Sequence, residues 1–196
     1  MHNRFRGAEP PAMRLVRPAA EHLASFVAAL ERDWSPDPSR GVAAAREVLD
    51  FVRADPRGFL DSLEDREAKG PPVTLPDGSV VARLPGFRRW MWDGEFAGTI
   101  GLRWQRGTPL LPPHALGHVG YTVVPWKQRR GYATAALRAM LAQARDVGLP
   151  YVEVTTDESN VASRRVIEAA GGVLHEAFVK PPEFGGTPSL RFRILL

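Results

Sequence analysis

Three basic side chains surround a glycine at the point where a predicted strand gives way to a predicted helix. Lys127, Arg129 and Arg130 come directly before or beside Gly131. The N-terminus of a helix offers unpaired N–H groups and a partial positive charge, and it therefore binds phosphate. Glycine also lets the backbone approach an anion closely. The segment 127–134 is therefore predicted to bind a pyrophosphate group.

The elements on either side of this loop follow from composition and periodicity. Residues 117–124 are rich in β-branched and aromatic side chains and end at Pro125, which is typical of a strand. Beyond the loop, apolar residues recur at the spacing of one helix face, namely Ala133, Ala136, Leu137, Met140, Leu141, Ala144 and Val147. Gly148 and Pro150 end this predicted helix. The basic loop is thus predicted to connect a strand to an amphipathic helix.

Two segments of the chain resemble one known family. Gln128-Arg129-Arg130-Gly131-Tyr132-Ala133 is similar to the Q/R-x-x-G-x-G/A signature of the GNAT superfamily of N-acetyltransferases, whose loop holds the pyrophosphate of acetyl-coenzyme A (acetyl-CoA). A second segment, Asn160 to Gly172, looks like the family's N-x-x-A/S-x-x-x-Y-E-x-x-G segment and follows a predicted strand at Tyr151–Thr156. The resemblance implies an acyltransferase. Such an enzyme would move acetyl from acetyl-CoA to a primary amine of a small molecule, peptide or protein by direct attack on the thioester.

The resemblance also implies which residues contact acetyl-CoA. Main-chain groups of Val123 and Val124 would pair with the pantetheine arm, and N–H groups near Val124 would face the thioester carbonyl. Asn160 would hydrogen-bond the same arm, and a plain helix N-cap is the alternative role for it. The full set of expected cofactor-binding residues is Val123, Val124, Gln128, Arg129, Arg130, Gly131, Tyr132, Ala133, Thr134, Asn160 and Ser163.

Acetyl transfer to an amine is helped by oxyanion donors and by a base that takes the amine proton. His118 and Glu153 are the catalytic candidates. His118 shares a strand face with Gly120, relatives often carry a glutamate at this place, and an unperturbed pKa of about 6.5 suits a base. A solvated or core-packed histidine is the alternative. Ile167 stands where some relatives carry a general-acid tyrosine, so we assign no acid.

The order of predicted elements indicates the fold. It is strand, helices, hairpin, strand, helix, strand, helix and two strands, which is typical of an α/β protein. Asp93-Gly94 is a strong signal for the hairpin between 87–92 and 95–104. The resemblance implies a GNAT-type mixed, mostly antiparallel central sheet flanked by helices. That sheet would be splayed between its fourth and fifth core strands, here 117–124 and 151–156.

Composition and length limit the remaining possibilities. The 196 residues include no cysteine, and the five histidines show no ligand spacing, so neither a disulfide nor a metal site is expected. We expect one domain over 1–196, with 1–12 flexible and 69–86 forming an insertion loop or hairpin. No signal peptide or membrane span is visible, which favours the cytoplasm.

Two other functions compete with the enzyme. A non-catalytic sensor of acyl-CoA with the same fold is motivated by the missing tyrosine. A basic RNA-associated protein is the weaker alternative, motivated only by the net charge of +4. The expected partners are acetyl-CoA and an amine acceptor that the sequence does not identify. The sequence leaves open whether the protein forms a homodimer, and neither a membrane nor a nucleic acid is expected as a partner.

Overall fold

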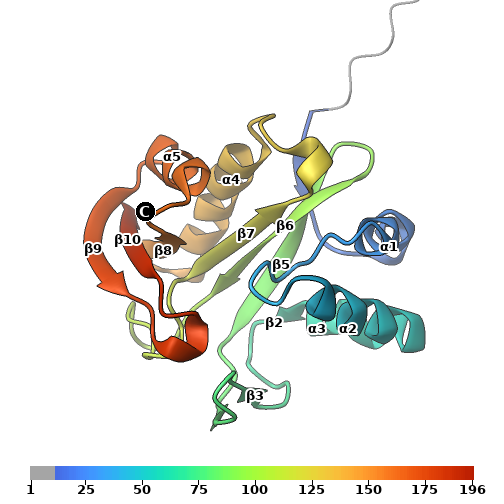
Figure 1. The fold of residues 1–196 in the computed structure, drawn as a ribbon, viewed down its shortest axis with the longest axis horizontal. Coiled ribbons are helices and arrows are strands. Elements are labelled where there is room, and N and C mark those ends of the chain that lie inside the picture. The colour runs from blue at the N-terminus through green and yellow to red at the C-terminus, as the bar shows by residue number, and fades with distance from the viewer. Residues whose placement is uncertain (1–11) are drawn as a thin grey trace, which may run out of the picture.

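Two antiparallel sheets form the centre of the protein, which is described here by a computed structural model covering residues 12–196 (Figure 1). Of the segment 1–12, which the sequence predicts to be flexible, residues 1–11 therefore lie outside the described residues. The larger sheet has the spatial order β1 (Arg14–Val16), β5 (Gly86–Trp92), β6 (Phe96–Arg103) and β7 (Val119–Val123), with β2 (Glu64–Asp65) also paired to β5. The smaller sheet has the order β8 (Tyr151–Asp157), β10 (Pro188–Leu195) and β9 (Val173–Val179). β7 and β8 are the facing edges of the two sheets and form no ladder with each other.

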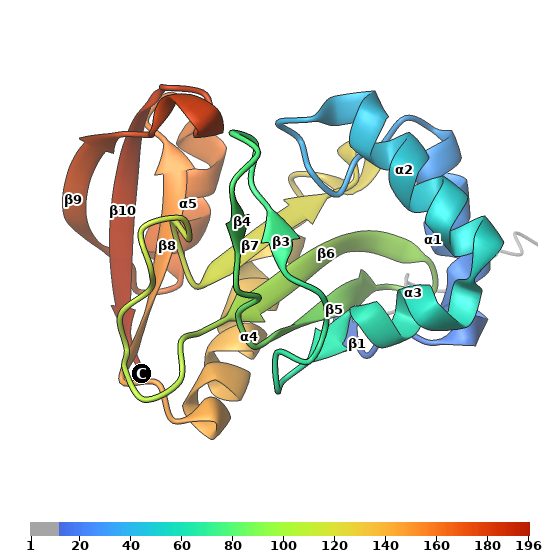
Figure 2. The ribbon, with the colours of Figure 1, turned by 90° about the horizontal axis from the view of Figure 1, so that it is seen from below.

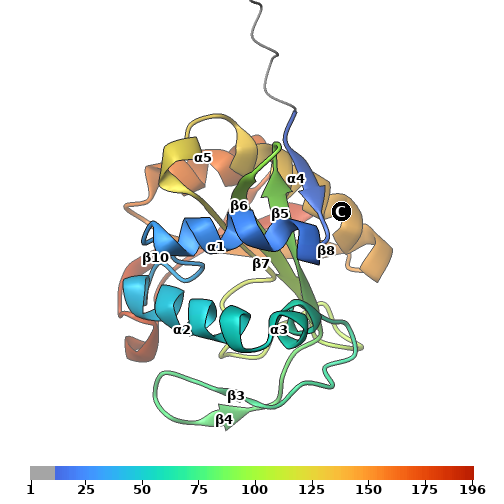
Figure 3. The ribbon, with the colours of Figure 1, turned by 90° about the vertical axis from the view of Figure 1, so that its right-hand side faces the viewer.

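Helices cover both faces of the larger sheet (Figure 3). On one face lie α4 (Tyr132–Val147) and α5 (Val161–Ala169), and on the other lie α1 (Leu23–Glu31), α2 (Gly41–Ala54) and α3 (Pro56–Ser62). The buried stripe of α4 includes Leu137 and Met140 and packs in one core with Ile100 of β6 and Val152 of β8. This shared core is why the two sheets stay together although their facing edges do not pair. None of the described helices is long and apolar enough to cross a membrane.

The hairpin predicted at Asp93-Gly94 is confirmed, since β5 and β6 pair in antiparallel register on either side of it. Gly94 has a φ of 104°, a conformation that glycine adopts without the strain of a side chain. Within the segment 69–86, β3 (Val73–Thr74) and β4 (Val80–Val81) pair as a short hairpin. Figure 2 shows this hairpin in front of the larger sheet, and Figure 3 shows that it extends below α2.

The backbone of β7 leaves no room for a side chain at Gly98 of β6. The φ of Gly98 is 153°, and a Cβ built on it would lie 2.3 Å from the carbonyl oxygen of Thr122 and 2.9 Å from the Cα of Val123. Both contacts are to backbone, so no side chain could move aside. By contrast, a Cβ on Gly120 in the neighbouring strand would meet no atom within 4 Å.

We therefore expect Gly98→Ala to lower the free energy of unfolding by at least about 2 kcal/mol, in the range of overpacked or strained sites. Gly120→Ala is the matched control, and it should stay within about 1 kcal/mol of the wild type. Urea unfolding followed by circular dichroism measures both. Equal unfolding midpoints for the two variants would show that β6 and β7 approach each other less closely at Gly98.

Candidate functional site

The loop before α4 presents a row of free backbone donors. In the part of the chain that the structure describes, the N–H groups of residues 129–134 donate to no protein acceptor. Arg129 has a φ of 61° and Gly131 a φ of 78°, whereas Arg130 between them does not have a positive φ. Alternation of this kind turns successive N–H groups toward one point and makes an anion-binding nest. A Cβ on Gly131 would meet nothing within 4 Å, so the nest is open.

The charged side chains of this loop have different roles. Arg129 and Arg130 are exposed, and neither forms an ion pair with the described residues. Gln128 donates from Nε2 to the carbonyl of Val123 at 3.3 Å. Lys127, expected to add a charge for the pyrophosphate, is buried, and its Nζ lies 2.6 Å from Oδ1 of Asp93. Two of the three cations, rather than three, are therefore available to an anion.

Lys127, Asp93 and Tyr132 together anchor the loop to the turn between β5 and β6. The side chains of Lys127 and Asp93 are only 8% and 5% exposed. The Tyr132 hydroxyl donates to Oδ2 of the same carboxylate at 2.7 Å. Burial by itself would raise the pKa of Asp93, but the hydrogen bonds from Lys127 and Tyr132 outweigh it and lower that pKa. The same hydrogen bond raises the pKa of the Tyr132 hydroxyl. Tyr132 thus contributes its N–H to the loop and its hydroxyl to the anchor.

The free edge of β7 corrects one expectation. The N–H of Val124 donates to the carbonyl of Ala97 at 3.0 Å, and the carbonyl of Val124 accepts from Lys127. Val124 therefore has no main-chain group to offer a pantetheine arm or a thioester. In an antiparallel strand alternate residues bond to the same neighbour. The main-chain groups of Val123 and Tyr121 consequently face the gap between β7 and β8.

The start of helix α5 carries two of the expected residues. Asn160 is its N-cap, and Oδ1 of Asn160 accepts from the N–H of Ser163 at 3.0 Å. The amide nitrogen of Asn160 has no protein partner among the described residues, so it can serve a ligand while the oxygen caps the helix. Ser163 Oγ lies 2.9 Å from the hydroxyl of Tyr121 on β7. Burial raises the pKa of Tyr121.

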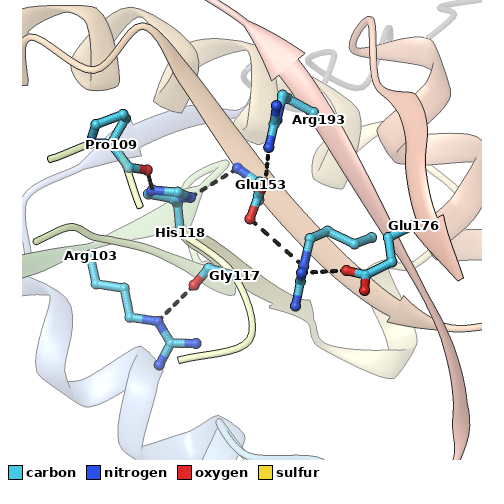
Figure 4. A network of polar contacts seen from close by, with 8 residues as sticks. Arg103, Pro109, Gly117, His118, Glu153, Glu176 and Arg193 are labelled. Carbon is cyan, nitrogen blue, oxygen red and sulfur yellow. Dashed lines mark hydrogen bonds and ion pairs between the residues drawn. The ribbon is translucent and has the colours of Figure 1, made fainter. Parts of the chain in front are cut away.

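His118 lies directly before β7, and both of its ring nitrogens are engaged within the fold. It is 1% exposed and joins the start of β7 to β8 (Figure 4). Its Nδ1 accepts from the N–H of Glu153 at 3.0 Å. Its Nε2 lies 3.1 Å from the carbonyl of Pro109 and must donate to it, because a carbonyl can only accept. Burial lowers the pKa of His118. In this geometry the ring is a neutral tautomer with no free lone pair, so it cannot take a proton from an amine.

Glu153, the second catalytic candidate, is held by arginines of β10. One carboxylate oxygen lies 2.7 Å from Nη2 of Arg193, and the other lies 3.7 Å from Nε of Arg191, which also contacts Glu176 (Figure 4). The carboxylate is 13% exposed. Both carboxylate oxygens of Glu153 thus face arginine side chains of β10.

A cavity of about 490 Å³ lies against the other side of β7. Its walls come from β5, β6 and β7 and from the turn at Pro36–Pro38, and His118 lines it. Arg88 and Arg103 also line it, and sequence reasoning did not single them out. The available signal was strand alternation, which places Arg88 on the same face as the buried Trp90. Ile167, by contrast, is fully buried in the core around α4 and points at no site.

The anchor predicts a pH-dependent stability. Lys127→Met would leave Asp93 buried without its cation, and removing one partner of a buried pair costs about 3–5 kcal/mol. Because the folded-state pKa of Asp93 is lowered, its contribution is present above the unfolded value of about 3.9 and is lost as pH falls through the folded pKa. The penalty of Lys127→Met, measured by urea unfolding, should therefore be full at about pH 7 and shrink as pH falls below about 4, where the carboxyl protonates.

The exposed pair Arg40–Glu47 supplies the control for this measurement, since its side chains are 51% and 61% exposed. Arg40→Met should leave the unfolding midpoint close to that of the wild type at either pH. If Lys127→Met behaves like Arg40→Met, the loop is not anchored through Asp93.

Comparisons with known proteins agree with this geometry. Residues 76–173, half of the chain, match the model of the acetyltransferase (GNAT) domain family. A search of curated proteins finds no match. Among similar solved structures is RimL, a ribosomal L7/L12 alpha-N-protein acetyltransferase in complex with coenzyme A, at TM-score 0.59 and 13% identity, covering 94% of each chain.

Two further structures are similar over nearly their whole length. MccE, the microcin C7 self-immunity acetyltransferase in complex with acetyl-CoA and AMP, has TM-score 0.57 and 10% identity over 94% of this chain and 92% of its own. A chimera of the Vibrio cholerae spermidine N-acetyltransferase SpeG and hSSAT has TM-score 0.59 and 12% identity over 93% and 94%. At these identities the likeness shows the fold. With the family match over half of its length, the chain belongs to the GNAT family of acetyltransferases.

Proposed function

We propose that the protein is an N-acetyltransferase that transfers acetyl from acetyl-CoA to a primary amine. The observation that carries the proposal is the row of free N–H groups at residues 129–134, with positive φ at Arg129 and Gly131. Such a nest suits the pyrophosphate of acetyl-CoA, and the exposed Arg129 and Arg130 side chains add positive charge beside it. The gap between β7 and β8 leads away from this nest.

The residues along the gap fit the rest of acetyl-CoA. The carbonyl of Val123 accepts from Gln128, so Val123 offers its N–H to the gap, and Asn160 offers an amide nitrogen that its capping role leaves free. We assign the pantetheine arm to Asn160. We assign the N–H of Val123 to the thioester carbonyl, where it would stabilise the oxyanion that forms on attack. Ser163 contributes through its hydrogen bond to Tyr121 at the other side of the gap.

The reaction that follows needs no base from the protein. A neutral amine attacks the thioester carbon, the C–N bond forms, and the C–S bond breaks as the thiolate leaves with its electron pair. The amine proton passes to solvent, because the ring nitrogens of His118 are both engaged and Glu153 is ion-paired. A thiol with a pKa of about 8.5, as in cysteine, is a fair leaving group without a general acid.

The cofactor loop is tested by a charge at Gly131. We expect Gly131→Asp to weaken acetyl-CoA binding at least about tenfold, roughly 1.4 kcal/mol, relative to Gly131→Asn. Asparagine has the same shape and tolerates positive φ, so the comparison isolates the negative charge. Isothermal calorimetry measures both affinities.

Gly148, at the other end of α4, is the positional control because its φ is 88° and its Cβ would also meet nothing within 4 Å. Gly148→Asp should cost similar backbone strain and leave acetyl-CoA affinity unchanged. Equal affinities for Gly131→Asp and Gly131→Asn would remove the pyrophosphate from this loop.

The source of the base is tested by the pH dependence of kcat/KM. If the amine ionises in solution, the ascending limb should follow the acceptor, near about 8 for an α-amine and near about 10.4 for a lysine-type amine. Release of free thiol measures the rate. A limb near about 6–7 with both acceptors, absent from His118→Ala, would instead make His118 the base. Acetyl-CoA binding without thiol release for any amine would favour the sensor.

A further inference from the structure

The cavity against β7 contains two arginines with no acidic partner. Arg88 forms no hydrogen bond or ion pair through its side chain with any described residue. Arg103 donates only from Nε, to the carbonyl of Gly117 at 2.8 Å, which leaves its terminal nitrogens free within the described structure. Both side chains retain solvent access and line the same cavity.

Strand register brings these two side chains together. Arg88 of β5 stands opposite Gly101 of β6, and Arg103 stands opposite Gly86. Arg88 and Arg103 are therefore diagonal neighbours on one face of the sheet. Burial lowers the pKa of Arg103, and the positive charge of Arg88 lowers it further, as expected of two guanidinium groups close enough to repel.

The two acidic side chains that line the cavity, Asp65 and Asp37, accept hydrogen bonds from residues near them in the sequence. Asp65 accepts from the N–H groups of Lys69 and Gly70, and Arg83 lies 3.8 Å from it. Asp37 accepts from the N–H and hydroxyl of Ser39. The neutral His118 adds no charge. Three arginines (Arg83, Arg88 and Arg103) and two aspartates (Asp37 and Asp65) line the cavity, and the charge of Asp37 also acts on Arg88, so the cavity has one positive charge in excess. Because Arg88 and Arg103 form no ion pair with a described residue, their guanidinium groups are the ones available to an anion.

The space beneath these guanidinium groups is also open. Gly101 and Gly120 stand opposite each other on β6 and β7, so backbone rather than side chains forms the cavity floor. The stem of Arg88 lies over Gly101, since its Cγ is 3.4 Å from the position of a Cβ there. A volume of about 490 Å³ lies within the range of small-molecule sites.

We propose that the acceptor is a small amine that also carries an anionic group, a carboxylate or a phosphate, which Arg88 and Arg103 bind together. This inference rests on the proposed acetyltransferase function and adds the acceptor class to it. β7 separates the cavity from the gap, so an anion on the arginines holds the acceptor on one side of β7 while its amine reaches toward the thioester at the strand's free edge. A purely cationic polyamine would be repelled.

Matched pairs of acceptors test the proposal. Thiol release is compared for γ-aminobutyrate against butylamine, and for phosphoethanolamine against ethanolamine. We expect the anionic member of at least one pair to have a kcat/KM at least about tenfold higher, as for a charge-assisted pair worth about 1.4 kcal/mol or more. The favoured pair identifies carboxylate or phosphate as the anion.

Arginine variants attribute the preference to the cavity. Arg88→Gln and Arg103→Gln should each remove most of the preference, measured as the ratio of kcat/KM for the anionic acceptor to kcat/KM for its neutral counterpart. Arg46→Gln, at an exposed position of α2 that does not line the cavity, changes the net charge equally and should keep the preference. Equal use of both members of each pair, or an equal loss for both in the variants, would overturn the proposal.

A measurement without turnover separates this inference from the proposed function. At constant ionic strength, malonate or inorganic phosphate should raise the melting temperature of the wild type and of Arg46→Gln. The shift should be smaller in the double variant Arg88→Gln/Arg103→Gln, where only the nest before α4 remains for the anion, and an equal shift would place the anion at that nest alone. If no amine releases thiol but this shift is seen, the acetyltransferase proposal fails and the anion site stands. No shift in the wild type refutes the anion site whatever the activity.

Discussion

The buried imidazole of His118 links the facing strands of the two sheets, which the core around α4 holds together. The facing strands β7 and β8 form no ladder, yet the N–H of His118 donates to the carbonyl of Glu153 and the N–H of Glu153 donates to Nδ1 of His118. The ring thereby replaces a backbone carbonyl in what would have been a strand pair. Only the neutral tautomer can make this contact, and burial favours that form by lowering the pKa. Beyond this point the strands are free to diverge, and their main-chain groups are left for a ligand.

The opposite end of the gap is fixed by a different kind of contact. Lys127 and Tyr132 both bind the carboxylate of Asp93, which ties the loop before α4 to the turn between β5 and β6. These contacts support the left-handed backbone conformations of the loop at Arg129 and Gly131. The basic residues of the loop therefore differ in role, since Lys127 forms a buried ion pair with Asp93 whereas the side chains of Arg129 and Arg130 remain exposed.

The sequence predicts those parts of the fold that local patterns determine. The turn at Asp93-Gly94 defines β5 and β6, and the apolar stripe from Ala133 to Val147 defines α4. The insertion of β10 between β8 and β9 has no local signal, because it depends on pairing across the whole C-terminal segment.

The roles of several candidate site residues could not be predicted from the sequence for the same reason, because they depend on contacts between distant parts of the chain. His118 lines a cavity, but the partners of its ring nitrogens are Pro109 and Glu153, the latter 35 positions away in the sequence. The role of Lys127 likewise depends on Asp93, 34 positions earlier. Val124 was mistaken for an open donor because strand register, and not residue type, decides which neighbour an N–H faces.

The glycine floor of the cavity bears on how this protein can diversify. At Gly120 the chain has room for a methyl group and needs no unusual backbone angle, so a single codon change there would make the cavity smaller without altering the sheet. Gly98, on the neighbouring strand β6, cannot carry a side chain, because a Cβ there would clash with the backbone of β7. Descendants of this sequence can therefore change the size of molecule they accept while the strands that carry the cofactor gap stay the same. One pair of strands thus contains both a glycine that tolerates a side chain and a glycine that does not.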